Sequence, residues 1–122
     1  MKLNRDCMRD VLLTVEEEVG FKDRVSIQTL HTFSRLKEYK LVDIFYCVEK
    51  LTEAGFIKGI TYKGGADVSE LTFEGHEFIE SIRDDDVWNK TKNELGKVGG
   101  ATLPIIVELA TSFLKTKLGL PV

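Results

Sequence analysis

Two strand-like segments around a glycine-rich turn constrain the fold of this chain more than any other feature. Residues 56–62 read FIKGITY, residues 68–71 read VSEL, and Lys63-Gly64-Gly65-Ala66 lies between them. Apolar and β-branched residues on both sides of a glycine-rich turn are typical of a β-hairpin. The sequence therefore predicts a two-stranded hairpin near the middle of the chain.

Three helices and a short strand are expected before the hairpin. Apolar residues recur with a helical repeat over residues 5–19, 32–40 and 43–54, whereas residues 25–28 alternate between apolar and polar. Asn4 and Asp43 are the expected N-caps of the first and third helices, and Gly55 is the expected end of the third.

Three further helices are expected after the hairpin. Thr72 can cap a helix that runs to about residue 83, and Asp86 can cap the next one. Gly99-Gly100 is the strongest helix breaker in the sequence, and Pro104 lies in the first turn of the last expected helix.

The order of these elements predicts an α+β fold of the winged helix-turn-helix class, with a two- or three-stranded β wing and a C-terminal helical extension. A helical pair followed by a two-stranded hairpin is the layout of that class. We expect a winged-helix domain over residues 1–83. Over residues 84–122 we expect a helical extension that packs on the same single domain.

Several motifs resemble those of known winged-helix proteins. Residues 51–57 (LTEAGFI) resemble the end of the recognition helix in many winged-helix regulators, and residues 71–78 (LTFEGHEF) resemble the exit from their wing. A longer match, carried by MKLNRD, LTFEGHEFIESIRDDDVW and LATSFLKTKLGL, resembles a domain-of-unknown-function family of small bacterial and prophage proteins, similar to the YjcQ-type winged-helix proteins. The resemblance implies a winged-helix fold and residence on phage or other mobile elements, and it implies no catalytic residue.

The composition excludes several classes of protein. The net charge is −3, with 17 basic and 20 acidic side chains, which disfavours a protein that coats nucleic acid through bulk charge. No apolar run reaches the roughly 18–20 residues that a membrane span requires. The charged start MKLNRD lacks the apolar segment of a signal peptide, so we expect a cytoplasmic protein with no membrane association.

Duplex DNA is one of two partners that the sequence leaves open. A winged helix binds DNA with its recognition helix in the major groove and its wing beside the backbone. Residues 33–63 carry six basic and four acidic side chains, and the candidate DNA-binding residues are Arg35, Lys37, Lys40, Tyr46, Lys50, Lys58 and Lys63. In this interpretation Tyr46 and Lys50 reach the groove, and the other five contact phosphates.

A protein is the other partner, and the sequence favours it. The expected outer face of the 43–54 helix shows Asp43, Tyr46, Cys47, Glu49, Lys50 and Glu53, which is one lysine against three carboxylates. That face opposes the phosphate neutralisation on which DNA affinity depends. Tyr46 is the expected anchor for a protein partner.

The last expected helix carries more apolar surface than a helix on a monomer needs. Its apolar side chains cover about half of the circumference, whereas a stripe of about 100° is sufficient. We therefore expect a homodimer through this helix. The candidate dimerisation residues are Ile105, Ile106, Leu109, Phe113 and Leu114. The alternative is that the helix fills a core formed by the first helix and the helix that carries Trp88.

No pattern in the sequence indicates an enzyme, a cofactor or a metal. Cys7 and Cys47 form neither a disulfide framework nor a metal-type pair, and Cys47, expected on an exposed helix face, has no base placed beside it. Asp84-Asp85-Asp86 lacks the ligand spacing of a calcium loop and is expected to cap a helix. His76 is expected to be a hydrogen-bonded packing residue. We therefore expect a non-enzymatic protein without a cofactor, a metal or a small-molecule substrate.

Overall fold

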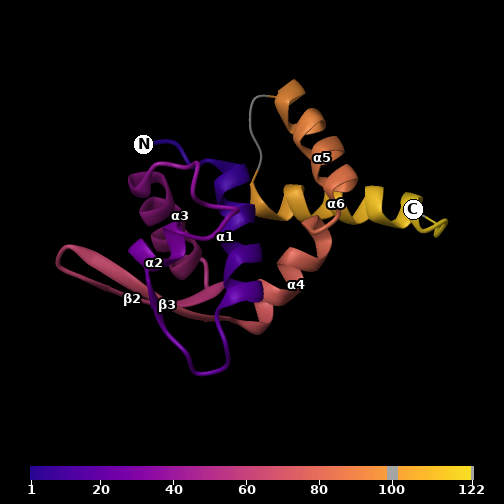
Figure 1. Ribbon diagram of the computed structural model, residues 1–122. Coiled ribbons are helices and arrows are strands. Elements are labelled where there is room, and N and C mark those ends of the chain that lie inside the picture. The colour runs from indigo at the N-terminus through magenta and orange to yellow at the C-terminus, as the bar shows by residue number, and fades with distance from the viewer. Residues whose placement is uncertain (99–101, 122) are drawn as a thin grey trace. The chain divides into compact units, whose positions relative to one another are not determined.

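The structure, a computed structural model, describes residues 1–98 and 102–121. Its elements in chain order are α1 (Arg5–Glu18), β1 (Val25–Ser26), α2 (Ile27–His31), α3 (Leu41–Glu53), β2 (Ile57–Tyr62), β3 (Gly65–Leu71), α4 (Phe73–Ile82), α5 (Asp85–Val98) and α6 (Leu103–Lys117) (Figure 1). The described residues thus form an α+β protein with six helices and a three-stranded antiparallel sheet, so the predicted α+β class is confirmed.

The chain forms two compact units, Met1–His76 and Glu77–Val122. The division lies inside α4, whereas the sequence placed the end of the first part at residue 83. The first unit holds the sheet with α1, α2 and α3, and the second holds the greater part of α4 with α5 and α6. Within the described ranges, no helix combines the length and the apolar character needed to cross a membrane.

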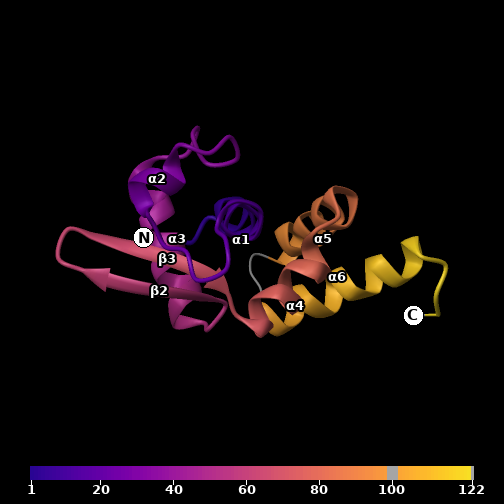
Figure 2. The same ribbon diagram turned by 60° about the horizontal axis from the view of Figure 1, so that its bottom comes forward.

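The sheet has the strand order β1–β3–β2, so β3 is central and β2 lies at an edge. Figure 2 shows β2 beside β3. Tyr62 pairs with Gly65, and Lys63-Gly64 forms the turn between the two strands. Gly64 has a φ of +87°, a backbone conformation that residues other than glycine rarely adopt. The predicted hairpin is confirmed, and its second strand begins at Gly65, ahead of the expected Val68.

β1 is shorter than the expected strand over residues 25–28, because the chain turns into a helix at Ser26. The Ser26 hydroxyl accepts a hydrogen bond from the Thr29 amide at 3.1 Å, which caps α2. Serine is a favoured N-cap because its side chain satisfies an amide that has no partner within the helix.

The helix predicted over residues 32–40 is wrong. This segment is a series of turns in which the amide of Leu36 donates to Phe33 and the amide of Tyr39 donates to Leu36. The Tyr39 hydroxyl donates to the Asp10 carboxylate of α1 at 2.7 Å, and the Tyr39 carbonyl lies 2.8 Å from His31 Nε2 of α2. Periodic apolar residues were therefore a sign of burial here, and the contacts of Tyr39 hold the turns against α1 and α2.

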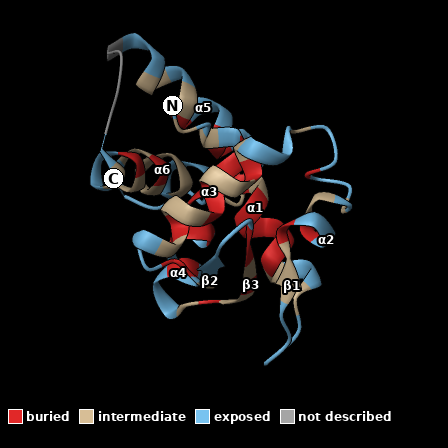
Figure 3. Ribbon diagram, turned by 90° about the vertical axis from the view of Figure 1, so that its left-hand side faces the viewer, coloured by how far each residue is buried: buried red, intermediate tan, exposed pale blue. Residues whose placement is uncertain are grey.

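The ends of α1 and α3 explain how these helices are positioned. Asn4 Oδ1 accepts from the Cys7 amide at 3.0 Å, which confirms the predicted N-cap of α1. α3 begins at Leu41 with Lys40 as its N-cap, so the prediction that Asp43 caps it is wrong. At the other end Gly55 has a φ of +80° and the Phe56 amide donates to the Leu51 carbonyl at 2.9 Å, the geometry of a Schellman motif. The inward faces of α1 and α3 are buried (Figure 3).

The two Leu-Thr-x-x-Gly segments of the sequence meet in the structure. The Thr72 amide donates to the Phe56 carbonyl at 3.0 Å, and the Thr72 hydroxyl donates to the Gly55 carbonyl. The same hydroxyl accepts from the Gly75 amide at 3.0 Å, which confirms Thr72 as the cap of α4. The exit from the hairpin is thereby joined to the end of α3.

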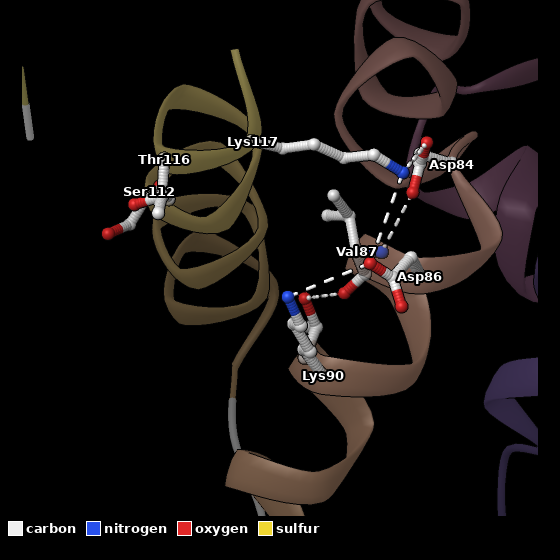
Figure 4. Close-up of polar contacts among 8 residues, drawn as sticks. Asp84, Asp86, Val87, Lys90, Ser112, Thr116 and Lys117 are labelled. Carbon is white, nitrogen blue, oxygen red and sulfur yellow. Dashed lines mark hydrogen bonds and ion pairs between the residues drawn. The ribbon is translucent and has the colours of Figure 1, made fainter. Parts of the chain in front are cut away.

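The second unit is organised by a cap at the start of α5. Asp84, and not the predicted Asp86, accepts from the Val87 amide at 3.0 Å. Lys117 of α6 reaches the other carboxylate oxygen of Asp84 at 2.7 Å (Figure 4). Pro104 lies in the first turn of α6 as predicted. The predicted breaker at Gly99-Gly100 lies outside the described residues.

Candidate interaction surface

The outer side of α3 exposes apolar side chains at its start. Val42 is 59% exposed, and Leu41 beside it is also exposed. Tyr46, one turn later, is half-buried, and Lys50 Nζ lies 5.3 Å from the centre of its ring. Lys50 Nζ also lies 2.7 Å from the Glu53 carboxylate, which raises the lysine pKa mainly through their hydrogen bond. The single lysine of this face is therefore already occupied by neighbours on the same helix.

The outer half of the hairpin is also exposed and partly apolar. Ile60 and Tyr62 of β2 are 49% and 48% exposed. The Tyr62 hydroxyl donates to the Asp67 carboxylate of β3 at 2.9 Å, and this bond raises the pKa of Tyr62. Lys58 Nζ lies 3.0 Å from the Glu70 carboxylate. The hairpin projects past α2 and α3, so its end is accessible (Figure 1).

The seven candidate DNA-binding residues do not form one set of available cations. Arg35 lies 2.7 Å from the Glu17 carboxylate, and Lys50 and Lys58 are paired as described above. Within the described residues, no ion pair involves Lys37, Lys40 or Lys63, all of which are exposed. The expected DNA-binding cations thus fall into two groups, those that pair with a carboxylate and those that are available to a phosphate.

A shallow hollow beside β2 was not predicted from the sequence. Its volume is about 350 Å³, and it is lined by Arg24, Lys58, Ile60 and Asp67 together with small and β-branched residues. Arg24 immediately precedes β1. Its position next to the strand expected over residues 25–28 is the sequence signal that could have predicted an arginine on the surface of the sheet.

Two expectations about reactive side chains are corrected by the structure. Cys47 is only 1% exposed, because it faces α1 and not solvent. Its sulfur lies 3.7 Å from the Asn4 carbonyl, and a hydrogen bond with Cys7 raises the pKa of Cys7 and lowers that of Cys47. His76 is exposed, with Nδ1 3.7 Å from the Glu16 carboxylate, so it is not a packing residue.

α6 presents part of the expected dimerisation set. Ile105 is 47% exposed and lines a groove of about 510 Å³ with Leu109 and with Leu95 of α5. Phe113 and Leu114 are half-buried. Ile106 is fully buried, so its assignment to an exposed dimerisation face is wrong. Its position on the helix places it toward the chain's own core, next to Ala110.

No cluster of three or more His, Cys, Asp or Glu side chains is placed to hold a metal ion in the described part of the chain. In the acidic run at the start of α5, Asp84 contacts Lys117, and Asp86 lies 3.6 Å from Lys90 and 4.0 Å from Lys117. These carboxylates act as a helix cap and as partners of two lysines.

Comparison with known proteins identifies a family. A family model described as "Hypothetical protein (DUF2513)" matches residues 2–101. The chain belongs to the DUF2513 family. An uncharacterised protein of Haemophilus influenzae (strain ATCC 51907 / DSM 11121 / KW20 / Rd) is 29% identical over 99 residues, which cover 78% of this chain and 79% of that protein. No solved structure matches the chain.

The DUF2513 match includes both parts of the exposed surface. α3 and the hairpin lie entirely within residues 2–101, whereas α6 begins at Leu103. The two exposed regions, the start of α3 and the outer hairpin, therefore both lie in the part of the chain that the family model matches.

Proposed function

We propose that this member of the DUF2513 family adopts a winged-helix fold and is a non-enzymatic module that binds another protein. The order α1-β1-α2-α3-β2-β3 and the strand order β1–β3–β2 support the fold. In this assignment α3 is the recognition helix and the β2–β3 hairpin is the wing. Because one fold serves many functions, the choice of partner depends on the surface.

The observation that carries the choice of a protein is the combination of exposed apolar side chains with paired cations. Val42, Ile60 and Tyr62 expose apolar surface on the two elements that a winged helix uses for contact. Lys50 and Lys58 on the same elements are neutralised by Glu53 and Glu70. Apolar and aromatic side chains are the usual anchors of protein interfaces, whereas DNA affinity depends on available cations.

Duplex DNA is a second candidate, and it is supported by the three lysines without an ion pair in the described residues. Lys40 lies at the start of α3, Lys63 lies at the tip of the hairpin, and Lys37 lies in the turns before α3. Contacts of these residues with phosphates would make binding steeply dependent on salt.

The two candidates predict opposite results for two variants. Val42→Glu places a charge on the exposed apolar surface, and we expect it to weaken capture of a partner protein from the native host by about tenfold or more. The double variant Lys40→Glu, Lys63→Glu should leave this capture unchanged. Phe73→Glu is the matched control, because Phe73 is exposed on α4, outside the proposed surface.

Affinity purification measures the capture of a partner protein by each variant. Fluorescence anisotropy at low salt measures the binding of each variant to a DNA duplex of mixed sequence. Tight duplex binding by the unaltered chain, abolished by the Lys40→Glu, Lys63→Glu variant, would overturn the protein-binding proposal in favour of DNA. Equal capture by the unaltered chain and by Val42→Glu would also overturn it.

We propose in addition that the chain forms a homodimer through α6. Ile105 and Leu109 support this proposal, because they expose apolar surface in a groove next to Leu95 of α5.

A further inference from the structure

The edge of the sheet formed by β2 has backbone groups without a strand partner. Tyr62 and Gly65 close a two-residue hairpin, so these two residues share ladder hydrogen bonds. Ladder bonds alternate along an antiparallel pair, so the amides and carbonyls of Gly59 and Thr61 point away from β3. Within the described residues, β2 pairs with β3 alone (Figure 2). An extended peptide can satisfy these groups by adding a strand.

The side chains along this edge favour a particular pattern in such a strand. Lys58, Ile60 and Tyr62 alternate along β2 and therefore lie on the same face of the sheet. Ile60 is half exposed and lies between two lysines in sequence, Lys58 and Lys63. An apolar side chain on the added strand can pack against Ile60, because directly opposite residues on neighbouring strands are in contact.

The charges around the edge favour acidic residues on either side of that apolar side chain. Arg24 and Lys58 line the hollow beside β2, and Lys63 lies at the turn. Glu70 pairs with Lys58 and Asp67 accepts from Tyr62, whereas no ion pair in the described ranges involves Arg24 or Lys63. Although Arg24 precedes β1 at the opposite edge of the sheet, it lines the same hollow as Ile60, so available positive charge lies in this hollow and, through Lys63, at the turn.

The same lysines disfavour a second copy of this chain as the added strand. Lysine on an edge strand is a common protection against edge-to-edge pairing, because two such edges bring like charges together. A strand with acidic side chains is instead attracted to the lysines of this edge.

We propose that β2 binds an extended segment of another protein as a fourth strand of the sheet, and that this segment carries an apolar residue between two acidic residues on one face. The inference rests on the proposed protein-binding function and specifies the chemistry of the partner. Main-chain hydrogen bonds to Gly59 and Thr61 provide the affinity, and Ile60, Arg24 and Lys63 select the sequence.

A synthetic peptide provides a direct test on the full chain. The probe is acetyl-Ser-Glu-Thr-Val-Thr-Glu-Ser-amide, which reads the same in both directions and thus tests parallel and antiparallel addition together. We expect it to shift the ¹⁵N–¹H resonances of Gly59 and Thr61 and to slow their exchange with solvent. The matched peptide with lysine in place of both glutamates should bind at least about tenfold more weakly.

A proline variant isolates the role of the backbone. Thr61→Pro removes an outward N–H and no ladder bond, and proline is tolerated on edge strands, so the fold should persist while peptide binding is lost. Thr61→Val keeps the N–H and should bind as the unaltered chain does. The spectrum of each variant without peptide verifies its fold.

Three results would overturn strand addition at β2. These are unchanged Gly59 and Thr61 resonances with the acidic peptide, equal binding of the two peptides, and full binding by Thr61→Pro. Shifts of the same resonances by a DNA duplex alone would assign the edge to nucleic acid, and a dimer lost in Thr61→Pro would assign it to a second copy. If Val42→Glu abolishes protein capture while Thr61→Pro does not, the proposed function stands and strand addition alone is wrong.

Discussion

At the scale of single residues, Gly75 shows how closely the start of α4 approaches the end of α3. A Cβ atom at Gly75 would lie 2.0 Å from the Phe56 carbonyl oxygen, which is far inside van der Waals contact. The Phe56 carbonyl oxygen accepts a hydrogen bond from the Thr72 amide, so this backbone atom cannot move independently. Glycine is required here by packing and not by an unusual backbone angle.

Gly75→Ala should therefore destabilise the chain, although alanine is the better helix former. We expect a loss of about 2–3 kcal/mol, because overpacking against backbone exceeds the gain in helix propensity of about 1 kcal/mol. The matched control is Gly96→Ala in α5, where an added Cβ meets nothing within 4 Å and a gain of about 1 kcal/mol is expected. Urea denaturation measures both changes, and equal signs for the two variants would contradict this account.

Local signals predicted three helix caps correctly, although Asp43 and Asp86 were wrongly expected to be N-caps, and the direction of a side chain was harder to predict. Asn4, Thr72 and Gly55 act through atoms within a few residues, so their roles were visible in the sequence. Cys47 and His76 depend on which face of a helix meets another element. That choice is made by tertiary packing, which a sequence pattern does not encode locally.

At the scale of elements, the turns at residues 32–40 mark the limit of periodicity as a signal. Phe33, Leu36 and Tyr39 have helical spacing, and Leu36 is fully buried. The spacing agrees with the burial of Leu36, but the side-chain hydrogen bond from Tyr39 to Asp10 belongs to a backbone of turns and not to a helix. The hairpin was predictable because its glycines and its strand residues indicate the same structure.

The start of α5 depends on pH through Asp84. Lys117 and the Val87 amide lower the pKa of Asp84 below its ordinary 3.8. A lowered pKa in the folded state stabilises the fold above about pH 3.8, and this contribution is lost as the pH falls through the folded-state pKa. The pKa of Lys117 is raised above 10.5, so its contribution is lost only as the pH rises through that higher value.

Asp84→Asn should reduce the acid sensitivity of the fold while keeping the helix cap, because asparagine is also a good N-cap. The expected result is a smaller fall in melting temperature between about pH 5 and about pH 2 than in the unaltered chain. Glu108→Gln is the control, because Glu108 is exposed and has no ion pair in the described residues. Identical pH profiles for Asp84→Asn and the unaltered chain would contradict the assigned role of Lys117.

At the scale of the whole molecule, the net charge of −3 conceals an uneven distribution. Residues 33–63 carry six basic and four acidic side chains, whereas residues 64–95 carry three and nine. The structure adds that Lys50 and Lys58 of the basic segment are paired with local carboxylates. Composition alone therefore could not separate the two candidate partners, because pairing is decided by geometry.

The dimer proposed to form through α6 can be tested by measuring the mass of the protein in solution. Light scattering at micromolar concentration should give about twice the 13.8 kDa mass of the chain, and Ile105→Lys should return the monomer. Because Ile105 is half exposed, this change should leave the melting temperature of the monomer nearly unaltered. Phe21→Lys, at an exposed site in the first unit, is the control. A monomer mass for the unaltered chain would contradict dimerisation.

The junction between the end of α3 and the start of α4 bears on how such sequences can diverge. Thr72 and Gly75 meet main-chain atoms of Gly55 and Phe56, so the side chains at positions 53, 54, 73 and 74 take no part in these contacts. The junction therefore depends on the positions of backbone atoms, and its contacts place no requirement on the side chains at these four positions. The two Leu-Thr-x-x-Gly segments are alike in sequence, but the glycine of the first ends α3 through its backbone conformation, and the glycine of the second allows α4 to start against that end.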